Sequence, residues 1–193
     1  AQCKRKLFEQ RQKRERPGRD EKIITAWNGY MISALALAGG VLAEAVYLER
    51  AIKCAQFIIN ELWAGGRLMR FWRGGTAYEK GFLEDYAAMC MAFISLYERT
   101  FDAKWLKHAL KLAQEMRELF GDEKYGGFFM NGRDDGGLIA NIKPVYDGAL
   151  PSGNSPAMTA LLKISRLTGK KELYDLAVTA IRSCGRQVSE AVT

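Results

Sequence analysis

Three short polar turns, each leading into a strongly apolar segment, constrain the fold of this chain more than any other feature. Each apolar segment is followed by an amphipathic one. Asn28 and Asp85 are 57 residues apart, and Asp85 and Asn154 are 69 residues apart. This spacing predicts helical hairpins set side by side, with one distinctive loop per repeat at one end of the assembly. The three turns lie at residues 25–29, 82–86 and 150–155.

The residue pattern predicts two kinds of helix. The apolar helices are expected over residues 28–42, 87–97 and 156–167, the first of them buried on every side. The half-exposed amphipathic helices are expected over residues 47–63, 103–120 and 172–184. Asp102 stands where an N-cap belongs, and Gly169 suits a helix C-cap. A further helix is expected over residues 3–15, stopped by Pro17 and Gly18.

Two longer connections carry strand-like patterns, at 66–80 and at Gly126–Pro144. Apolar inner helices, amphipathic outer helices and hairpin-bearing loops at one end predict an all-α fold with short β-hairpins in the loops. The architecture is that of an α/α toroid of the six-hairpin glycosidase type, (α/α)6. A closed toroid needs about six hairpins, so the three expected here correspond to about half a toroid or to an open arc. The start at Ala1 also suggests a piece of a longer protein.

Charge is concentrated at the N-terminus of this 193-residue chain. Residues 1–22 supply five of the seven net positive charges and are expected to form a basic helix and linker before an α/α-hairpin domain over 23–193. Without aromatic stacking residues or a nucleic-acid motif, a solvated helix is favoured over nucleic-acid binding. No apolar run reaches the ~18 residues of a membrane span. The four cysteines lack metal-ligand spacing, which favours free thiols and a cytoplasmic location.

Four carboxylates at loop positions are candidates for catalysis. A pair of carboxylates across a sugar ring can act as acid and base or as acid and nucleophile. Helix capping is the alternative for Asp85, as it is for Asn28 and Asn154, because these residue types favour N-cap positions. The candidate catalytic residues are Asp20, Glu84, Asp85 and Asp147.

Polar and aromatic neighbours of the turns are candidates for substrate binding. Trp27 and Tyr86 could stack on sugar rings, although such aromatics also serve as core. Arg16 and Lys22 could bind an anionic substrate or could be surface charge. His108 is the single histidine and falls on the solvent face of an outer helix, so no histidine base, metal or cofactor is expected. The binding candidates are Arg16, Lys22, Trp27, Asn28, Tyr86, Ser152 and Asn154.

Three motifs together carry a family resemblance. The runs 16–29, 82–87 and 147–155 resemble, in order and spacing, those of the YyaL-like, spermatogenesis-associated protein 20 family. Family members usually carry Asp-Asp-Lys where this chain has Asp20-Glu21-Lys22, and Leu in place of Tyr30. The resemblance implies a longer protein in which a thioredoxin-like domain precedes a toroid similar to those of N-acylglucosamine 2-epimerases and six-hairpin glycosidases. The histidines of the epimerases have no counterpart in this chain.

Two functions follow as hypotheses. In the first, the chain is part of a carbohydrate-active toroid that binds or processes a sugar-like molecule at the loop end of its inner helices, with epimerase-like, isomerase-like or glycosidase-like chemistry. In the second, it is a non-catalytic helical scaffold that docks a thioredoxin-like domain or a partner protein. Inner helices left uncovered by a partial toroid also predict self-association.

Overall fold

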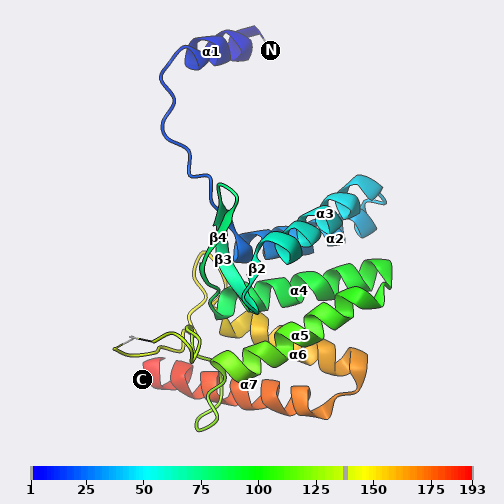
Figure 1. Cartoon of the computed structure of the whole chain (residues 1–193), viewed down its shortest axis with the longest axis vertical. Coiled ribbons are helices and arrows are strands. Elements are labelled where there is room, and N and C mark those ends of the chain that lie inside the picture. Colours follow the sequence, from blue (N-terminus) through cyan, green and yellow to red (C-terminus); the bar gives the residue numbers. More distant parts are fainter. Residues whose placement is uncertain (1, 137–138, 193) are drawn as a thin grey trace.

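The computed structural model describes residues 2–136 and 139–192, with side chains described up to residue 185. Its helices form three antiparallel hairpins stacked side by side (Figure 1). The inner helices are α2 (Thr25–Val41), α4 (Leu83–Thr100) and α6 (Asn154–Thr168). The outer helices are α3 (Ala45–Glu61), α5 (Ala103–Phe120) and α7 (Lys171–Val192). This arrangement confirms the predicted α/α-hairpin fold.

Helix α4 forms the centre of the core, packed between α2 and α6 and against α5. Small side chains such as Ala88 and Ala92 let the neighbouring helices approach, and both are fully buried. The rings of Phe93 and Trp105 stack with centroids 5.9 Å apart and fix α5 on α4. The predicted burial of this helix is therefore correct for most of its length.

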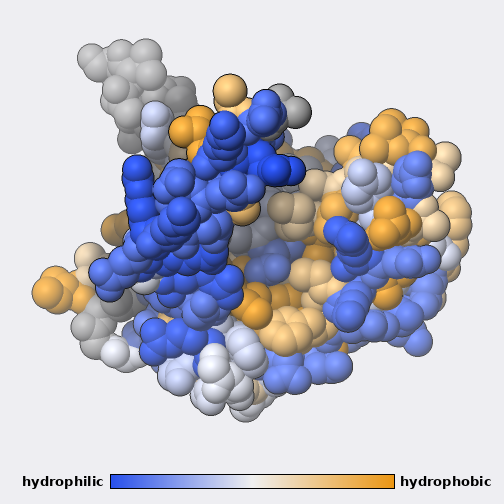
Figure 2. Space-filling model, turned by 90° about the horizontal axis from the view of Figure 1, so that it is seen from above, coloured by the Kyte–Doolittle hydropathy of each residue, from blue (hydrophilic) through white to orange (hydrophobic). Residues whose placement is uncertain are grey.

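Helix α2 is not buried on every side, contrary to the sequence prediction. Met31 is 55% exposed, Leu37 53% and Val41 70%. Within the described residues, α2 packs against α3, α4 and the strands, so no further hairpin covers its remaining face. Seen from above in Figure 2, hydrophilic residues cover one half of the visible face, and many of the exposed apolar residues lie on the other half.

A small antiparallel sheet lies beside the starts of the inner helices (Figure 1). Its central strand, β3 (Arg67–Arg73), pairs with the other three strands. Gly74 and Gly75 have φ angles of 59° and 92°, which the tight β3–β4 turn requires. The hairpin predicted over 66–80 is therefore confirmed. The remaining strands are β1 (Ile23–Ile24), β2 (Trp63–Ala64) and β4 (Thr76–Lys80).

The second predicted hairpin, over Gly126–Pro144, does not form strands in the described residues. One isolated bridge joins Gly121 and Phe128, and Leu138 lies outside the described residues. Single backbone hydrogen bonds and side chains hold this connection instead: the Met130 amide donates to the Ile142 carbonyl at 2.8 Å, and side chains bind further groups. Lys143 Nζ, for example, donates to Asp122 Oδ2 at 2.8 Å and to the Gly126 carbonyl at 3.0 Å.

The helix ends agree in part with the predicted caps. Asp102 Oδ1 accepts from the Lys104 amide at 3.0 Å, and Gly169 adopts a φ of 72° after α6. None of Asn28, Asp85 and Asn154 occupies the N-cap position itself, but Asp85, at the third position of α4, does cap its helix, because its Oδ2 accepts from the amide of the N-cap residue Phe82. The side chains of Asp85 and Asn154 also bind other segments, as described below.

The N-terminal helix α1 (Gln2–Gln12) ends three residues earlier than predicted and buries no residue. A linker leads from it to β1 (Figure 1). No helix in the described part of the chain is long and apolar enough to cross a membrane.

Candidate functional site

The first turns of α2, α4 and α6 meet at one end of the molecule because two glycines allow close approach. A Cβ added to Gly29 would lie 2.8 Å from the carbonyl carbon of Ala88. A Cβ added to Gly153 would lie 3.0 Å from the backbone nitrogen of Glu84. A Cβ on Gly29 would overlap the Ala88 backbone, and a Cβ on Gly153 would be a tight contact, so glycine at both positions lets α2 and the entry to α6 pack closely on the first two turns of α4. Glu84 therefore lies between the starts of two neighbouring inner helices.

Asp85 ties three elements together through one buried carboxylate. Its Oδ1 accepts from the Ala26 amide of α2 at 3.0 Å, and its Oδ2 accepts from the Phe82 amide at 2.9 Å. Arg70 of β3 donates to Oδ2 at 3.1 Å. Burial raises the pKa of Asp85 to about 6, while Arg70 and the amide donors oppose the rise. With both oxygens engaged by the protein, Asp85 positions its neighbours.

Glu84 is the more accessible of the two adjacent carboxylates. Its side chain is 32% exposed, and its Oε1 accepts from Arg70 Nη1 at 2.7 Å. Among the described residues, its Oε2 has no hydrogen-bond partner. The Arg70 guanidinium lies 4.3 Å from the Phe82 ring centroid. This contact helps to hold the guanidinium where it pairs with the carboxylates of Glu84 and Asp85. Glu84 thus presents a free oxygen beside a charged donor.

Two buried hydroxyl groups at this end lack partners within the described residues. They are Tyr30 Oη on α2 and Ser152 Oγ just before α6, and the Ser152 hydroxyl still lies near enough to the Asp147 carboxylate to help lower its pKa. Burial raises the pKa of the Tyr30 phenol, and the negative charges of Glu84, Asp85 and Asp147 raise it further. An unpartnered buried hydroxyl is unfavourable unless something else binds it.

Asp147 shapes the turn that enters α6. Its Oδ1 accepts from the Ser152 amide at 2.8 Å and from Ser155 Oγ at 2.9 Å. These hydrogen bonds, the Ser152 amide first, lower the pKa of Asp147. The carboxylate is exposed and ionised at neutral pH. Asp147 can therefore hold the turn and still face a ligand.

Asp20 lies apart from the other three carboxylates. It sits on the linker before β1, where its side chain pairs with Lys22 at 3.2 Å and stays largely exposed. Lys22 Nζ lies 5.4 Å from the Phe71 ring centroid, on the outside of the sheet. Arg16 is also exposed and donates to Gln12 on α1. Within the described residues, the hydrogen bonds and ion pairs of Asp20, Lys22 and Arg16 do not include Glu84, Asp85 or Asp147.

The two asparagines predicted to bind substrate make contacts within the protein. Asn154 Oδ1 accepts from the Phe128 amide at 2.9 Å, and its Nδ2 donates to the carbonyls of Phe128 and Pro144. Asn28 Nδ2 donates to the Ile24 carbonyl at 2.8 Å. Trp27, in contrast, is 59% exposed at the start of α2. Of these three residues, Trp27 alone presents its side chain to solvent.

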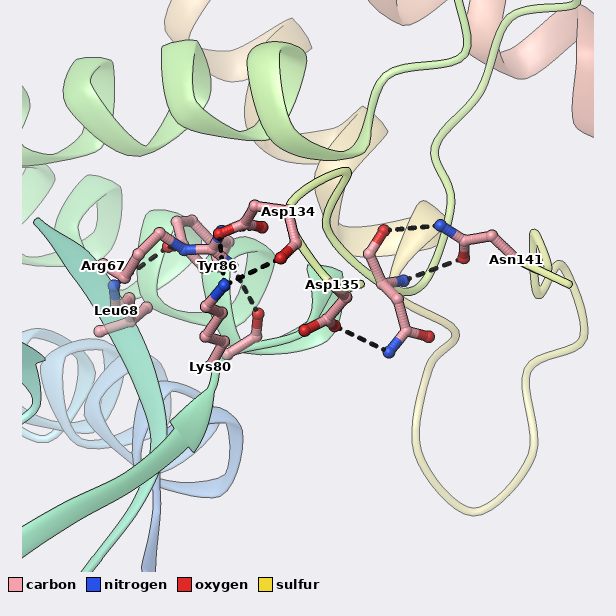
Figure 3. Close-up of polar contacts among 9 residues, drawn as sticks. Arg67, Leu68, Lys80, Tyr86, Asp134, Asp135 and Asn141 are labelled. Carbon is pink, nitrogen blue, oxygen red and sulfur yellow. Dashed lines mark hydrogen bonds and ion pairs between the residues drawn. The ribbon is translucent and has the colours of Figure 1, made fainter. Parts of the chain in front are cut away.

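Tyr86 anchors a polar network on the other side of α4 (Figure 3). Its buried hydroxyl accepts from the Leu68 amide and from Arg67 Nε, each at 3.0 Å. Arg67 also pairs with Asp134, which Lys80 of β4 contacts at 2.9 Å. The network fixes the connection between α5 and α6 to the sheet. Tyr86 is therefore a structural contact and not an exposed stacking platform.

The sequence reasoning missed Arg70 and Tyr30. No sequence motif predicts the role of Arg70, because that role depends on which strand lies beside α4. Tyr30 directly follows the Asn28-Gly29 motif, and this position in the sequence is the one signal that could have indicated its place near the site. No group of acidic, histidine or cysteine side chains suited to hold a metal ion occurs in the part of the chain that the structure describes.

Curated relatives match most of this chain. Spermatogenesis-associated protein 20 from Homo sapiens is 38% identical over 184 residues, and the Rattus norvegicus protein is 36% identical. Each match covers 90% of this chain and 23% of the relative, so the chain spans about a quarter of the relatives' length. No protein-family profile matches the chain. The predicted resemblance is confirmed for the segment that the chain spans.

Solved α/α toroids share the fold. Cellobiose 2-epimerase from Bacillus thermoamylovorans B4167 has a TM-score of 0.71 at 15% identity, covering 86% of this chain and 45% of the epimerase. A family 76 glycoside hydrolase (mannosidase) from Bacteroides thetaiotaomicron VPI-5482 has a TM-score of 0.68 at 17% identity, covering 84% and 44%. An α-1,6-mannanase from Salegentibacter sp. HEL1_6 has a TM-score of 0.68 at 19% identity, covering 83% and 46%. Its structure is that of an inactive variant with two consecutive aspartates replaced, in complex with α-1,6-mannotetrose.

Proposed function

Because this chain is a relative of one segment of spermatogenesis-associated protein 20 and has an α/α toroid fold, we propose that it contributes to the sugar-binding mouth of a carbohydrate-active toroid. The mouth consists of the starts of α2, α4 and α6. The single observation that carries the proposal is the partly exposed Glu84 carboxylate, whose Oε2 is free, at the same helix starts as the Asp147 carboxylate and the Ser155 hydroxyl. Sugars bind through such hydroxyl and carboxylate groups because their own hydroxyls both donate and accept hydrogen bonds.

The arrangement of carboxylates supports acid/base chemistry at this mouth. Glu84 and Asp147 are the carboxylates that combine exposure with a place at the helix starts, and they are our candidates for the acid and base. Asp85 holds Arg70 and the start of α2 in place for Glu84. Glu84 and Asp85 are consecutive carboxylates, as are the two aspartates replaced in the inactive mannanase. This likeness supports a carbohydrate substrate and leaves the reaction open between isomerisation and hydrolysis.

The exposed apolar face of α2 favours a second candidate function. Met31 and Leu37 lie on a helix that is covered from fewer sides than α4. Such a face is typical of a surface that packs against another helical unit. In this second proposal the chain is a scaffold that docks a partner protein or a thioredoxin-like domain, and Glu84 has no ligand.

A sugar panel separates these functions. We expect neutral mono- and disaccharides, including mannose and cellobiose, to raise the melting temperature of the wild-type chain. Glu84→Gln should weaken that binding by about tenfold or more, because it removes a charged hydrogen-bond acceptor. Glu61→Gln, an exposed position at the end of α3, is the matched control and should bind like the wild type. A panel without any response would leave the scaffold as the better account.

A further inference from the structure

We infer that two copies of this chain assemble into one closed ring, in which the α2–α3 side of each copy packs against the α6–α7 side of the other. The inference goes beyond the proposed function and does not depend on sugar binding. It starts from the two outermost hairpins (Figure 1), each of which exposes an apolar stripe on the side away from the central hairpin. The α2 edge consists of Trp27, Met31, Ala34, Ala38 and Val41, and the α7 edge consists of Tyr174, Val178 and Ile181.

The α2 edge lies on the side of α2 that is turned away from α4. Gly29, Ile32 and Ala36 are buried on the side that faces α4. The residues of the α2 edge recur every three or four positions, about half a turn around the helix from these buried residues. Met31 is 55% exposed and Val41 is 70% exposed. The α2 edge therefore offers a continuous apolar stripe to a further helix.

The α7 edge lies on the side of α7 that is turned away from α5. Leu176 and Thr179 line a hollow beside the C-terminal end of α5. The residues of the α7 edge recur at the helical spacing of four and three on the opposite side of α7. Tyr174 is 49% exposed and Ile181 is 44% exposed. Both ends of the stack of hairpins are thus apolar.

Apolar stripes at both ends of the stack favour association in one particular order. A stack that ends at its own terminal repeats needs a polar outer face on each of them. Because the two edges are formed by different residues, the α2 edge of one copy can pack on the α7 edge of another, as neighbouring hairpins pack within the chain. Contacts of this kind give a closed ring if the rotation closes and an open filament if it does not.

The curvature of the stack and the size of the fold favour closure by a second copy. All three inner helices border one hollow of about 240 Å³, which Ser33 of α2, Ser95 of α4 and Lys163 of α6 line together. The stack therefore bends around this side. The chain covers 45% of the cellobiose 2-epimerase that shares its fold, so two copies account for nearly all of such a toroid. In a ring with its twofold axis along the inner helices, both copies present their helix starts at the same end.

The edges are large enough for a stable dimer. Helices α2 and α3 have 17 residues each, so the side of their hairpin measures about 25 Å by about 20 Å, or about 500 Å². A ring of two copies has two junctions, and each junction covers one edge of each copy. The total buried surface is about 2,000 Å², which is at the upper end of the range for specific interfaces of standard size.

The mass of the chain in solution tests the ring. Light scattering on the full chain at tens of micromolar should give twice the mass of one chain, without larger species. Met31→Lys on the α2 edge and Ile181→Lys on the α7 edge should each weaken the dimer at least about tenfold, because each places a charge in both junctions. Leu7→Lys, at an exposed position of α1 outside both edges, is the matched control and should keep the dimer. A monomeric or polymeric wild type would overturn the ring.

An equimolar mixture of the two variants tests which edges meet. Met31→Lys or Ile181→Lys alone damages both junctions of the ring. A mixed pair places both substitutions in one junction and leaves the other junction intact, so the mixture should form dimers that neither variant forms alone. Such recovery also shows that both variants are folded. A mixture that stays monomeric, or Ile181→Lys that dimerises like the wild type, would overturn the pairing of the α2 edge with the α7 edge. Sugar is absent throughout, so either result leaves the proposed function to its own test.

Discussion

Asp85 is the residue on which the geometry of the mouth depends. Asp85→Ala would leave the Ala26 and Phe82 amides without their acceptor and would remove one partner of Arg70. We expect the free energy of unfolding, measured by urea denaturation, to fall by about 2–4 kcal/mol. Asp175→Ala at an exposed position of α7 should change it by no more than about 0.5 kcal/mol. Equal effects of the two substitutions would refute the anchoring role.

The same carboxylate makes stability depend on pH. Burial raises the pKa of Asp85 to about 6, above the value of ~3.9 expected in the unfolded chain. The folded state therefore binds the proton more tightly, and the stability from this group is complete below pH 4 and lost as the pH rises through 6. The loss should approach about 3 kcal/mol. Asp85→Asn should abolish this pH-dependent part of the free energy of unfolding, measured in unfolding curves between pH 4 and 7. An identical pH profile in the wild type and in Asp85→Asn would contradict this prediction.

At the scale of the elements, the approach of α2 to α4 depends on Gly29. Alanine normally stabilises a helix interior relative to glycine by about 1 kcal/mol. At Gly29 the added Cβ would meet the Ala88 backbone at 2.8 Å, so we expect Gly29→Ala to destabilise the chain by about 1–3 kcal/mol. Gly185→Ala in α7, where a Cβ meets nothing within 4 Å, should instead stabilise it. Thermal unfolding of both variants measures whether each substitution lowers or raises stability. A stabilising Gly29→Ala would refute the close approach of α2 to α4.

The elements were largely predictable from sequence, whereas the site was only partly so. Apolar periodicity is local, so the helices of all three hairpins and the 66–80 strand pair could be predicted. The roles of Asp85, Asn154 and Tyr86 could not, because their partners lie 26 to 59 residues away or on another element. Residue type alone groups Asp20 with the other carboxylates, whereas in the structure it lies on the linker and pairs with Lys22. The type of each side chain indicated candidate site residues, whereas tertiary packing determines which hydrogen bonds those residues make.

At the scale of the whole molecule, the exposed face of α2 predicts association. Met31 and Leu37 offer apolar surface that three hairpins leave uncovered. We expect light scattering to show self-association of the chain at micromolar concentration, reduced in the double variant Met31→Lys with Leu37→Lys. Leu7→Lys, at an exposed position on α1, should leave association unchanged. A wild-type chain that is monomeric over this concentration range would contradict the prediction.

The central claim is that the starts of the three inner helices form a sugar-binding mouth. Amide chemical-shift mapping during a glucose titration tests it most directly, because it reports the place of binding and its strength together. Perturbations concentrated around Tyr30, Glu84 and Ser152, and absent in Glu84→Gln, are the expected result. Perturbations confined to the N-terminal linker or the outer helices, or none at saturating glucose, would contradict the claim.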